Sequence, residues 1–258
     1  MISIYDCFGY GLGYDVSFSE RYRMIKNVGF DSVMLWWSDK FGRGIGYQRD
    51  VQFARNAGLH IENMYVPVHE QNFLSMDNLD GESVFQSYLQ CVNDCFEFRI
   101  PVIVIHLPDD KHPINNLGLE RIGIMIHEAE WYDIQIAFEN LDNIQNLALV
   151  LRSFRSKNVG FCYDSCHHIN YAPNIDLLKL YGNRLMALHL HDNGGKNNQH
   201  QLPFDGDIDW QTVMRRISLT GYKGAIALEP MNWDYGNLSI QQFLDLAYQR
   251  AKKLMVCG

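Results

Sequence analysis

The sequence contains no cluster of lysine and arginine, no long apolar run and only six cysteines in 258 residues. Its net charge is −8, and because nucleic acids are bound through basic surfaces, we expect no nucleic-acid partner. No window of about 18 apolar residues is present to cross a membrane, and the first residues lack the basic segment of a secretory signal. These absences predict a cytoplasmic protein with no membrane partner.

The cysteines are too sparse for the disulfide framework that stabilises small secreted proteins. Cys91 and Cys95 are separated by three residues, as are Cys162 and Cys166. This spacing does not complete a zinc site with four sulfur ligands. We therefore expect reduced thiols that pack in the core.

Short apolar or β-branched runs alternate with longer segments of helical periodicity from one end of the chain to the other. Eight strands are predicted, at residues 2–5, 32–37, 60–65, 102–106, 134–138, 159–163, 185–190 and 225–228. Eight helices are predicted, at residues 18–28, 47–57, 81–97, 117–131, 144–156, 174–182, 210–220 and 239–255. This alternation is typical of an α/β protein with parallel strands.

Eight strand-helix units in a chain of this length favour a closed (β/α)8 barrel, the TIM barrel, over an open sheet. Ser17 and Glu20 form a capping pattern before the first helix, and Gly29 and Gly221 stand where a helix would end before a strand. No linker divides the sequence, so residues 1–258 are predicted to form a single domain.

The longest irregular segments, 66–80, 107–116 and 191–209, each follow a predicted strand. In a TIM barrel such segments emerge at the face formed by the carboxyl ends of the strands, where active sites are built. The polar residues at these strand ends are therefore the first candidates for a functional site.

Four consecutive strands end in side chains that bind metals. Glu139 follows the fifth predicted strand, Asp164 the sixth and Glu229 the eighth, while His189 lies near the end of the seventh. One such residue alone is usually only a solvated strand end, but four would meet at one rim. Three carboxylates and one imidazole predict a site for one divalent cation, Mn²⁺ or Mg²⁺ first, with Co²⁺ or Zn²⁺ also accommodated.

Longer motifs surround these residues. They are Phe-Glu-Asn-Leu at 138–141, Tyr-Asp-Ser-Cys-His at 163–167, Leu-His-Leu-His-Asp at 188–192, Phe-Asp-Gly-Asp-Ile-Asp-Trp at 204–210, Gly-Tyr-Lys-Gly at 221–224 and Leu-Glu-Pro at 228–230. In this order and spacing, over nearly the whole chain, the sequence resembles the xylose-isomerase-like superfamily of sugar isomerases and epimerases. That superfamily also contains endonuclease IV, inosose isomerases and ketose 3-epimerases.

The resemblance implies roles for individual residues. Glu139, Asp164, His189 and Glu229 match the four metal ligands of the family, and His167 matches its substrate-contacting histidine.

A second histidine, His106, follows the fourth strand, where the family often has another substrate-side histidine. Capping of the strand end is an equal alternative for it. We expect His189 rather than His191 to be the ligand, with His191 on the opposite side of the strand. Asp192 is expected to orient a ligand.

Other residues are candidates for contact with a substrate. We expect the segment 191–209 to close over the substrate and to contribute His200 or Lys196, since long loops in compact domains are often functional. The sequence Gly194-Gly195-Lys196 has the composition of a weak phosphate-binding turn.

Aromatic residues follow the first three strands, and Trp37 is the one we predict to contact a sugar through its apolar face. Phe8, Trp36 and Tyr65 are placed similarly, and for all four residues core packing or simple cover of the rim is an alternative of at least equal weight.

The sequence departs from two branches of the superfamily. Tyr65 stands where endonuclease IV has a zinc-binding histidine, and Asn198 replaces the aspartate that precedes His200 in its pattern. Gln145 and Gly195 replace a glutamate and an arginine of the ketose 3-epimerases. Membership in either branch is therefore not expected.

The resemblance implies a divalent-metal-dependent isomerase or epimerase of a sugar or cyclitol. It would act by proton transfer through a metal-stabilised enediolate, with Glu139 and Glu229 as the acid/base pair. The alternatives are a lyase that dehydrates such a substrate with the same metal, an endonuclease IV-like phosphodiesterase with two or three metals, and a non-catalytic binding barrel. Assembly into a homo-oligomer stays open.

Overall fold

The computed structural model describes residues 1–39, 46–68, 70–195 and 198–257. Within them the chain forms eight parallel strands, each buried over most of its length, as expected where helices cover a parallel sheet. The strands are β1 (Ile2–Tyr5), β2 (Ser32–Trp36), β3 (His60–Tyr65), β4 (Val102–Ile105), β5 (Gln135–Glu139), β6 (Val159–Asp164), β7 (Leu185–His189) and β8 (Ile226–Leu228).

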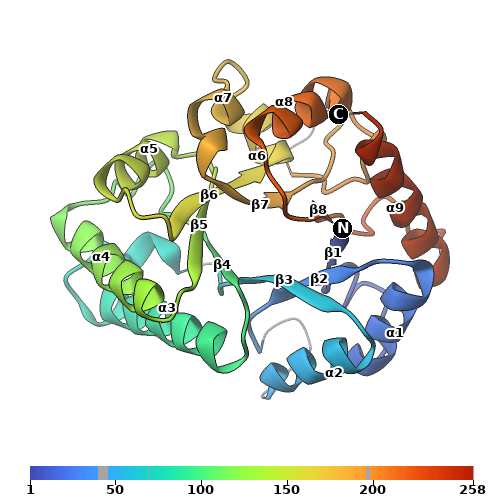
Figure 1. Ribbon diagram of the computed structural model, residues 1–258, viewed down its shortest axis with the longest axis horizontal. Helices are drawn as coiled ribbons and strands as arrows, with labels where there is room; N and C mark the ends of the chain where they lie inside the picture. Colours follow the sequence, from blue (N-terminus) through green and yellow to red (C-terminus); the bar gives the residue numbers. More distant parts are fainter. Residues whose placement is uncertain (40–45, 69, 196–197, 258) are drawn as a thin grey trace.

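The strands form a barrel in the order in which they occur in the chain (Figure 1). β1 pairs with both β2 and β8, and the pairing continues from β2 through to β7. Between β7 and β8 a bridge joins Leu190 to Leu228, and Glu229 N donates to Leu190 O over 3.0 Å. This contact closes the barrel, so the predicted TIM-barrel fold is confirmed.

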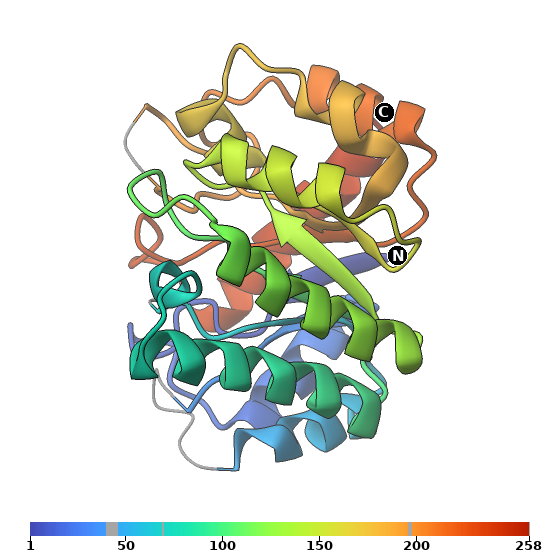
Figure 2. The same cartoon turned by 90° about the vertical axis from the view of Figure 1, so that its left-hand side faces the viewer.

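The helices cover the outside of the barrel (Figures 1 and 2). They are α1 (Phe18–Val28), α2 (Asp50–Asn56), α3 (Leu79–Glu97), α4 (Asn116–Trp131), α5 (Ile144–Ser153), α6 (Ser165–Tyr171), α7 (Leu177–Tyr181), α8 (Trp210–Thr220) and α9 (Ile240–Met255), with the 3-10 turns η1 (Tyr47–Arg49), η2 (Gln71–Phe73) and η3 (Gly182–Arg184). None of the helices that the structure describes is long and apolar enough to span a membrane.

Local signals set the limits of these helices as predicted. The side chain of Ser17 accepts a hydrogen bond from Glu20 N at the start of α1. Gly29 and Gly221 end α1 and α8 with φ values of 118° and 77°, in the left-handed region that glycine enters without steric cost. All six cysteines are free, and all except Cys257 are buried.

The helix α6 is absent from the sequence-based prediction. Asp164 ends β6 and at once caps α6, its Oδ1 accepting from His167 N over 2.7 Å. The seven residues of α6 are too few to show a helical period, so pattern alone does not reveal them.

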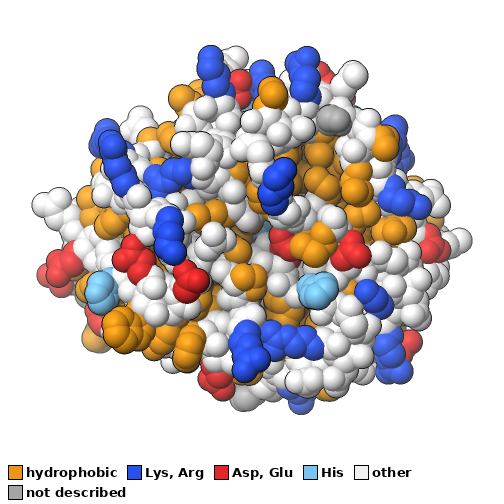
Figure 3. Space-filling view, in the orientation of Figure 1, with side chains coloured by type: hydrophobic (Ala, Val, Ile, Leu, Met, Phe, Trp, Pro, Cys, Tyr) orange, Lys and Arg blue, Asp and Glu red, His pale blue; other side chains and the backbone are white. Residues whose placement is uncertain are grey.

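The two ends of the barrel differ. The arrow of β5 in Figure 2 points to the side on which the connections from strands to helices lie, and the amino terminus lies at the opposite side. Figure 3 views this opposite face, where Lys and Arg side chains are mixed with Asp and Glu. The carboxyl-end face is the one at which the predicted ligand residues meet.

Candidate metal and active site

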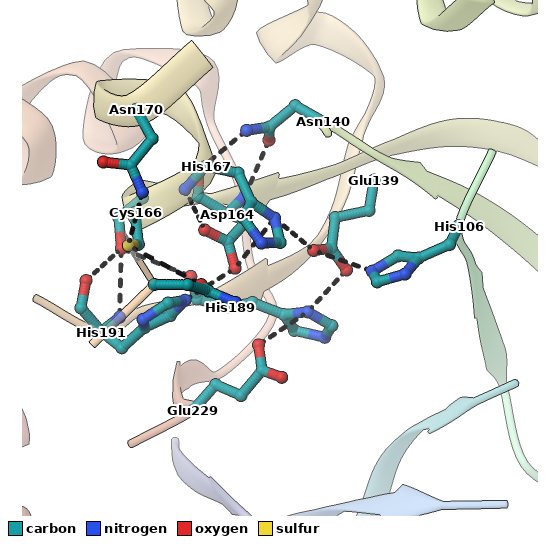
Figure 4. A network of polar contacts seen from close by, with 12 residues as sticks. His106, Glu139, Asn140, Asp164, Cys166, His167, Asn170, His189, His191 and Glu229 are labelled. Carbon is teal, nitrogen blue, oxygen red and sulfur yellow. Dashed lines mark hydrogen bonds and ion pairs between the residues drawn. The ribbon is translucent and has the colours of Figure 1, made fainter. Parts of the chain in front are cut away.

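Four strand ends bring Glu139, Asp164, His189 and Glu229 together (Figure 4). Glu139, Asp164 and His189 are the last residues of β5, β6 and β7, and Glu229 directly follows β8. All four side chains are buried. The barrel itself therefore positions these residues, because adjacent parallel strands end side by side.

His189 lies between the two glutamates. Its Nδ1 is 2.9 Å from Glu139 Oε2 and 3.2 Å from Glu229 Oε2. Asp164, His189 and Glu229 form one group whose potential ligand atoms lie within 4.8 Å of one another, and Glu139, Asp164 and His167 form another. The two groups share Asp164, so the potential ligand atoms converge on one region.

These atoms are close together but do not satisfy one another. Both oxygens of Glu139, His189 Nδ1 and Glu229 Oε2 are buried without a hydrogen bond of good geometry. Buried polar atoms left without partners are costly, so these atoms are suited to bind an added ligand. A divalent cation fits this set, because three carboxylates and one imidazole supply mostly oxygen donors.

The surroundings shift the acidity of the carboxylates in different directions. Burial acts to raise the pKa of Glu139, but the charges of His106 and His189 outweigh it and hold that pKa well below its usual value. At Asp164, burial likewise acts to raise the pKa, but the charges of His167 and His191 outweigh it and lower the pKa to about 2. At Glu229, burial is offset only in part by His189, and its pKa is raised. Glu139 and Asp164 are therefore ionised at neutral pH, as cation binding requires.

Asp164 is held from three sides. Its backbone N donates to Asn140 Oδ1 and its carbonyl accepts from Asn140 Nδ2, over 2.8 and 2.9 Å. Its Oδ2 lies 2.9 Å from His191 Nε2. Ser165 Oγ donates to the carbonyl of His191, which fixes that residue in turn. Asn140, Ser165 and His191 therefore position the carboxylate, a role that sequence reasoning did not assign to them.

The expectation that His191 points away from His189 was wrong. Residues two positions apart in an extended chain share a face. β7 ends at His189, and both imidazoles turn toward the carboxylates. His191 is fully buried and reaches Asp164, whereas His189 reaches Glu139 and Glu229.

His167 and His106 both contact Glu139. His167 Nδ1 lies 3.0 Å from Glu139 Oε1, and His106 Nε2 lies 3.3 Å from the same oxygen. The hydroxyl of Tyr65 is in hydrogen-bond contact with His106 Nε2. His106 is thus more than a strand cap, because its ring joins the carboxylate cluster.

A cavity of about 420 Å³ opens beside this cluster. His106, His167, His200 and Glu229 line it together with Tyr65. The remaining lining residues are Tyr5, Cys7, Tyr10, Gly11, Leu12, Trp36, Val68, Asn198, Met231 and Trp233. The predicted substrate-side histidines therefore share one cavity.

Trp37 does not reach this cavity, and its predicted contact with substrate was wrong. The indole is fully buried, its Nε1 donates to Asp94 Oδ2 over 2.6 Å, and its ring packs against Tyr47 and Phe98. β2 ends at Trp36, and successive side chains of a strand point to opposite sides. Trp36 therefore faces the cavity and Trp37 faces the helices.

His200, which we predict to contact the substrate, lies in the segment after β7 and lines the cavity. Its ring stacks on His191 at 3.9 Å between centroids, and its Nδ1 lies 2.9 Å from the carbonyl oxygen of Glu229. Burial and the neighbouring His191 lower the pKa of His200 to about 3. Lys196, the other residue predicted from this segment, lies outside the described residues.

Asp192 does not orient a metal-ligating side chain, contrary to expectation. Its buried carboxylate accepts from Asn193 N, Phe204 N, Ile208 N and Trp210 Nε1, over 2.9, 2.8, 3.1 and 2.6 Å. These bonds tie both ends of the connection between β7 and α8 to one side chain. Asp192 therefore holds the segment that carries His200.

Replacing Asp192 with alanine is expected to lower the free energy of unfolding by about 2–4 kcal/mol, because four donors lose their acceptor. Urea unfolding followed by circular dichroism measures this change. The matched control is Asp207→Ala at an exposed position of the same segment. Equal stabilities of the two variants would contradict the role of Asp192.

Residues from the connection after β8 were missed by sequence reasoning. Met231 and Trp233 line the cavity, as do Tyr10 and Leu12 from the connection after β1. The only signal for Met231 and Trp233 is their place directly behind Glu229. Tyr10 and Leu12 carry no such signal.

Comparisons with known proteins agree with this fold. The family model described as xylose isomerase-like TIM barrel matches residues 22–246. The uncharacterized protein y4fM of Sinorhizobium fredii is 29% identical over 259 residues, covering 85% of this chain and 83% of that protein.

Two solved structures superpose over nearly their whole length. D-psicose 3-epimerase with D-tagatose, from Clostridium cellulolyticum H10, has a TM-score of 0.74 at 18% identity, covering 97% of this chain and 96% of that chain. The IOLI protein with a binding zinc atom has a TM-score of 0.76 at 15% identity, covering 99% and 97%. At these identities the two structures establish a common fold.

Proposed function

The chain belongs to the xylose isomerase-like TIM-barrel family, and from this premise we propose that it is a divalent-metal-dependent isomerase or epimerase of a sugar or cyclitol. The observation that carries the proposal is the pair of buried glutamates on either side of His189, beside a cavity. Such a pair suits proton transfer at a carbon next to a carbonyl. We propose further that residues 1–258 form one domain.

Glu139, Asp164, His189 and Glu229 would hold the cation. Their unsatisfied, buried ligand atoms support this assignment, and Mn²⁺ or Mg²⁺ suits the oxygen-rich set best. A bound divalent cation would supply a Lewis acid that polarises the substrate carbonyl. One of the two similar solved structures, the IOLI protein, has a binding zinc atom.

The residues of the chain would divide the remaining work. Glu229 lines the cavity, so its carboxylate would take or return a proton at the substrate carbon. Glu139, on the other side of His189, would act as the second acid/base group. Protons passed between opposite faces give epimerisation, whereas return to the neighbouring carbon on one face gives aldose–ketose isomerisation. His167 would donate a hydrogen bond to a substrate oxygen, with His106 beside it.

Deuterium exchange tests the proposal directly. The protein, loaded with Mn²⁺, is incubated in deuterated water with a mixed pool of sugars and inositols, and the products are analysed by mass spectrometry and NMR. We expect deuterium at one or two carbon positions of an accepted substrate, with one metal ion bound per chain. Turnover without such exchange would refute the isomerase proposal, and a dehydrated product would favour a lyase instead. A content of two or three metals would favour a phosphodiesterase.

A further inference from the structure

The two sides of the cavity differ in polarity. The cluster of histidine and carboxylate side chains comes from the ends of β5 to β7, from α6 and from the connections after β4, β7 and β8, and it includes His106, His167 and Glu229. The rest of the lining, apart from Asn198, comes from β1 to β3 and the connections after β1, β3 and β8, and we call it the apolar wall. Its side chains are mainly aromatic or aliphatic: Tyr5, Cys7, Tyr10, Leu12, Trp36, Tyr65, Val68, Met231 and Trp233.

The polar side-chain groups of this wall are three tyrosine hydroxyls, the indole N–H groups of Trp36 and Trp233, and the thiol of Cys7. The hydroxyl of Tyr65 already contacts His106. Tyr5 also has an interaction of its own within the protein. The rest of the surface of these side chains is carbon and sulfur, and a sugar hydroxyl that leaves water without a new partner loses binding free energy.

Two large apolar side chains of this wall stay half-exposed. Leu12 and Trp233 are 49% and 50% exposed. Both side chains line the cavity, and ligand cavities are lined mostly by apolar and aromatic side chains. An apolar group of the ligand placed there would cover both side chains and remove their surface from water.

The described lining contains no lysine or arginine, and Glu229 supplies a negative charge. Arg21 lies nearby but is buried, and its guanidinium donates to the carbonyl of Phe8 over 2.7 Å. Among the described residues, recognition of a substituent on this wall therefore depends on apolar contact and not on ion pairing.

We propose that the substrate is a sugar or cyclitol carrying an apolar substituent, such as an aryl or alkyl ether. Its hydroxy-carbonyl part faces the histidine and carboxylate cluster, and its substituent packs against Trp36, Leu12 and Trp233. The cavity of about 420 Å³ has room for a ring and a substituent, since pockets for ligands of that size measure about 300–1,000 Å³. This inference rests on the proposed function, because it describes the substrate of the same site.

Matched ligand pairs test the inference without relying on activity. D-fructose and 6-O-benzyl-D-fructose are titrated into metal-free and Mn²⁺-loaded protein, and tryptophan fluorescence reports binding. We expect the benzyl ether to bind at least tenfold more tightly in both forms. Equal affinities, or tighter binding of D-fructose, would overturn the inference.

Variants locate the effect in the cavity wall. Leu12→Gln and Trp233→Gln are expected to reduce the preference for the benzyl ether at least fivefold. Their matched controls are Leu219→Gln and Trp131→Gln, at side chains that are each 80% exposed outside the cavity lining. Equal losses in the controls would also overturn the inference.

Deuterium exchange separates the two proposals. Preferential binding of the benzyl ether, without exchange in any sugar, would support the apolar substituent and refute the proposed isomerase function. Exchange in D-fructose with no preference for its ether would support the isomerase function and refute the apolar substituent.

Discussion

Asp164→Asn is expected to lower the affinity for Mn²⁺ roughly 100-fold or more, since groups that merely support a metal ligand already contribute about 10–100-fold. The substitution removes one negative charge from a buried cluster and places an amide where an oxygen faces His191. The fold should survive, because asparagine caps a helix as well as aspartate does. The bond from His167 N to Oδ1 can therefore remain at the start of α6.

Isothermal titration with Mn²⁺ and metal analysis after dialysis measure this loss, and thermal unfolding checks the fold. The matched control is Asp176→Asn, because Asp176 also caps a helix, accepting from Lys179 N at the start of α7. Metal affinity close to that of the unchanged protein would show that Asp164 is a structural cap only. Unfolding of the variant would show that its charge serves stability.

The barrel could be predicted from sequence because its signals are local and repeated. Runs such as Val102–Ile105 and Val159–Asp164 are short, apolar and buried, and helical periods separate them. Glycine at 29 and 221 marks helix ends by its backbone conformation alone. The convergence of the four ligand candidates then follows from topology, since their strands are neighbours.

Details within one or two residues of a strand end could not be predicted. Trp36 and Trp37 are identical in type and adjacent, so only the true end of β2 decides which of them faces the cavity. The role of Asp192 depends on donors as distant in the chain as Trp210. Its sequence neighbours give no sign of those bonds, which form only when the segment after β7 folds back.

The different surroundings of the two glutamates could also not be predicted from sequence. Sequence places Glu139 and Glu229 in equivalent positions after strands. In the folded chain, Glu139 contacts three imidazoles, His106, His167 and His189, while Glu229 contacts His189 and opens to the cavity. Groups whose surroundings push their pKa values apart are typical of acid/base pairs.

Glu139→Gln and Glu229→Gln are each expected to reduce substrate turnover about 100- to 10,000-fold, the usual contribution of a positioned acid or base. Glutamine keeps an oxygen that can still bind the cation, but it can neither take nor return a proton. At saturating Mn²⁺ both variants should therefore retain metal while losing turnover. Each variant keeps the other carboxylate, which can still remove a proton from its own face of the substrate. Slow deuterium exchange from that face should therefore persist when turnover is lost.

Turnover and deuterium exchange, measured together with metal content, separate this role from metal binding. Glu120→Gln on α4 is the matched control, because that side chain is exposed and distant in the chain from both carboxylates. Loss of turnover in proportion to loss of metal would make both glutamates ligands and nothing more. Loss of turnover at full metal occupancy, with exchange confined to opposite faces in the two variants, identifies one acid/base group on each side of the substrate, as epimerisation requires.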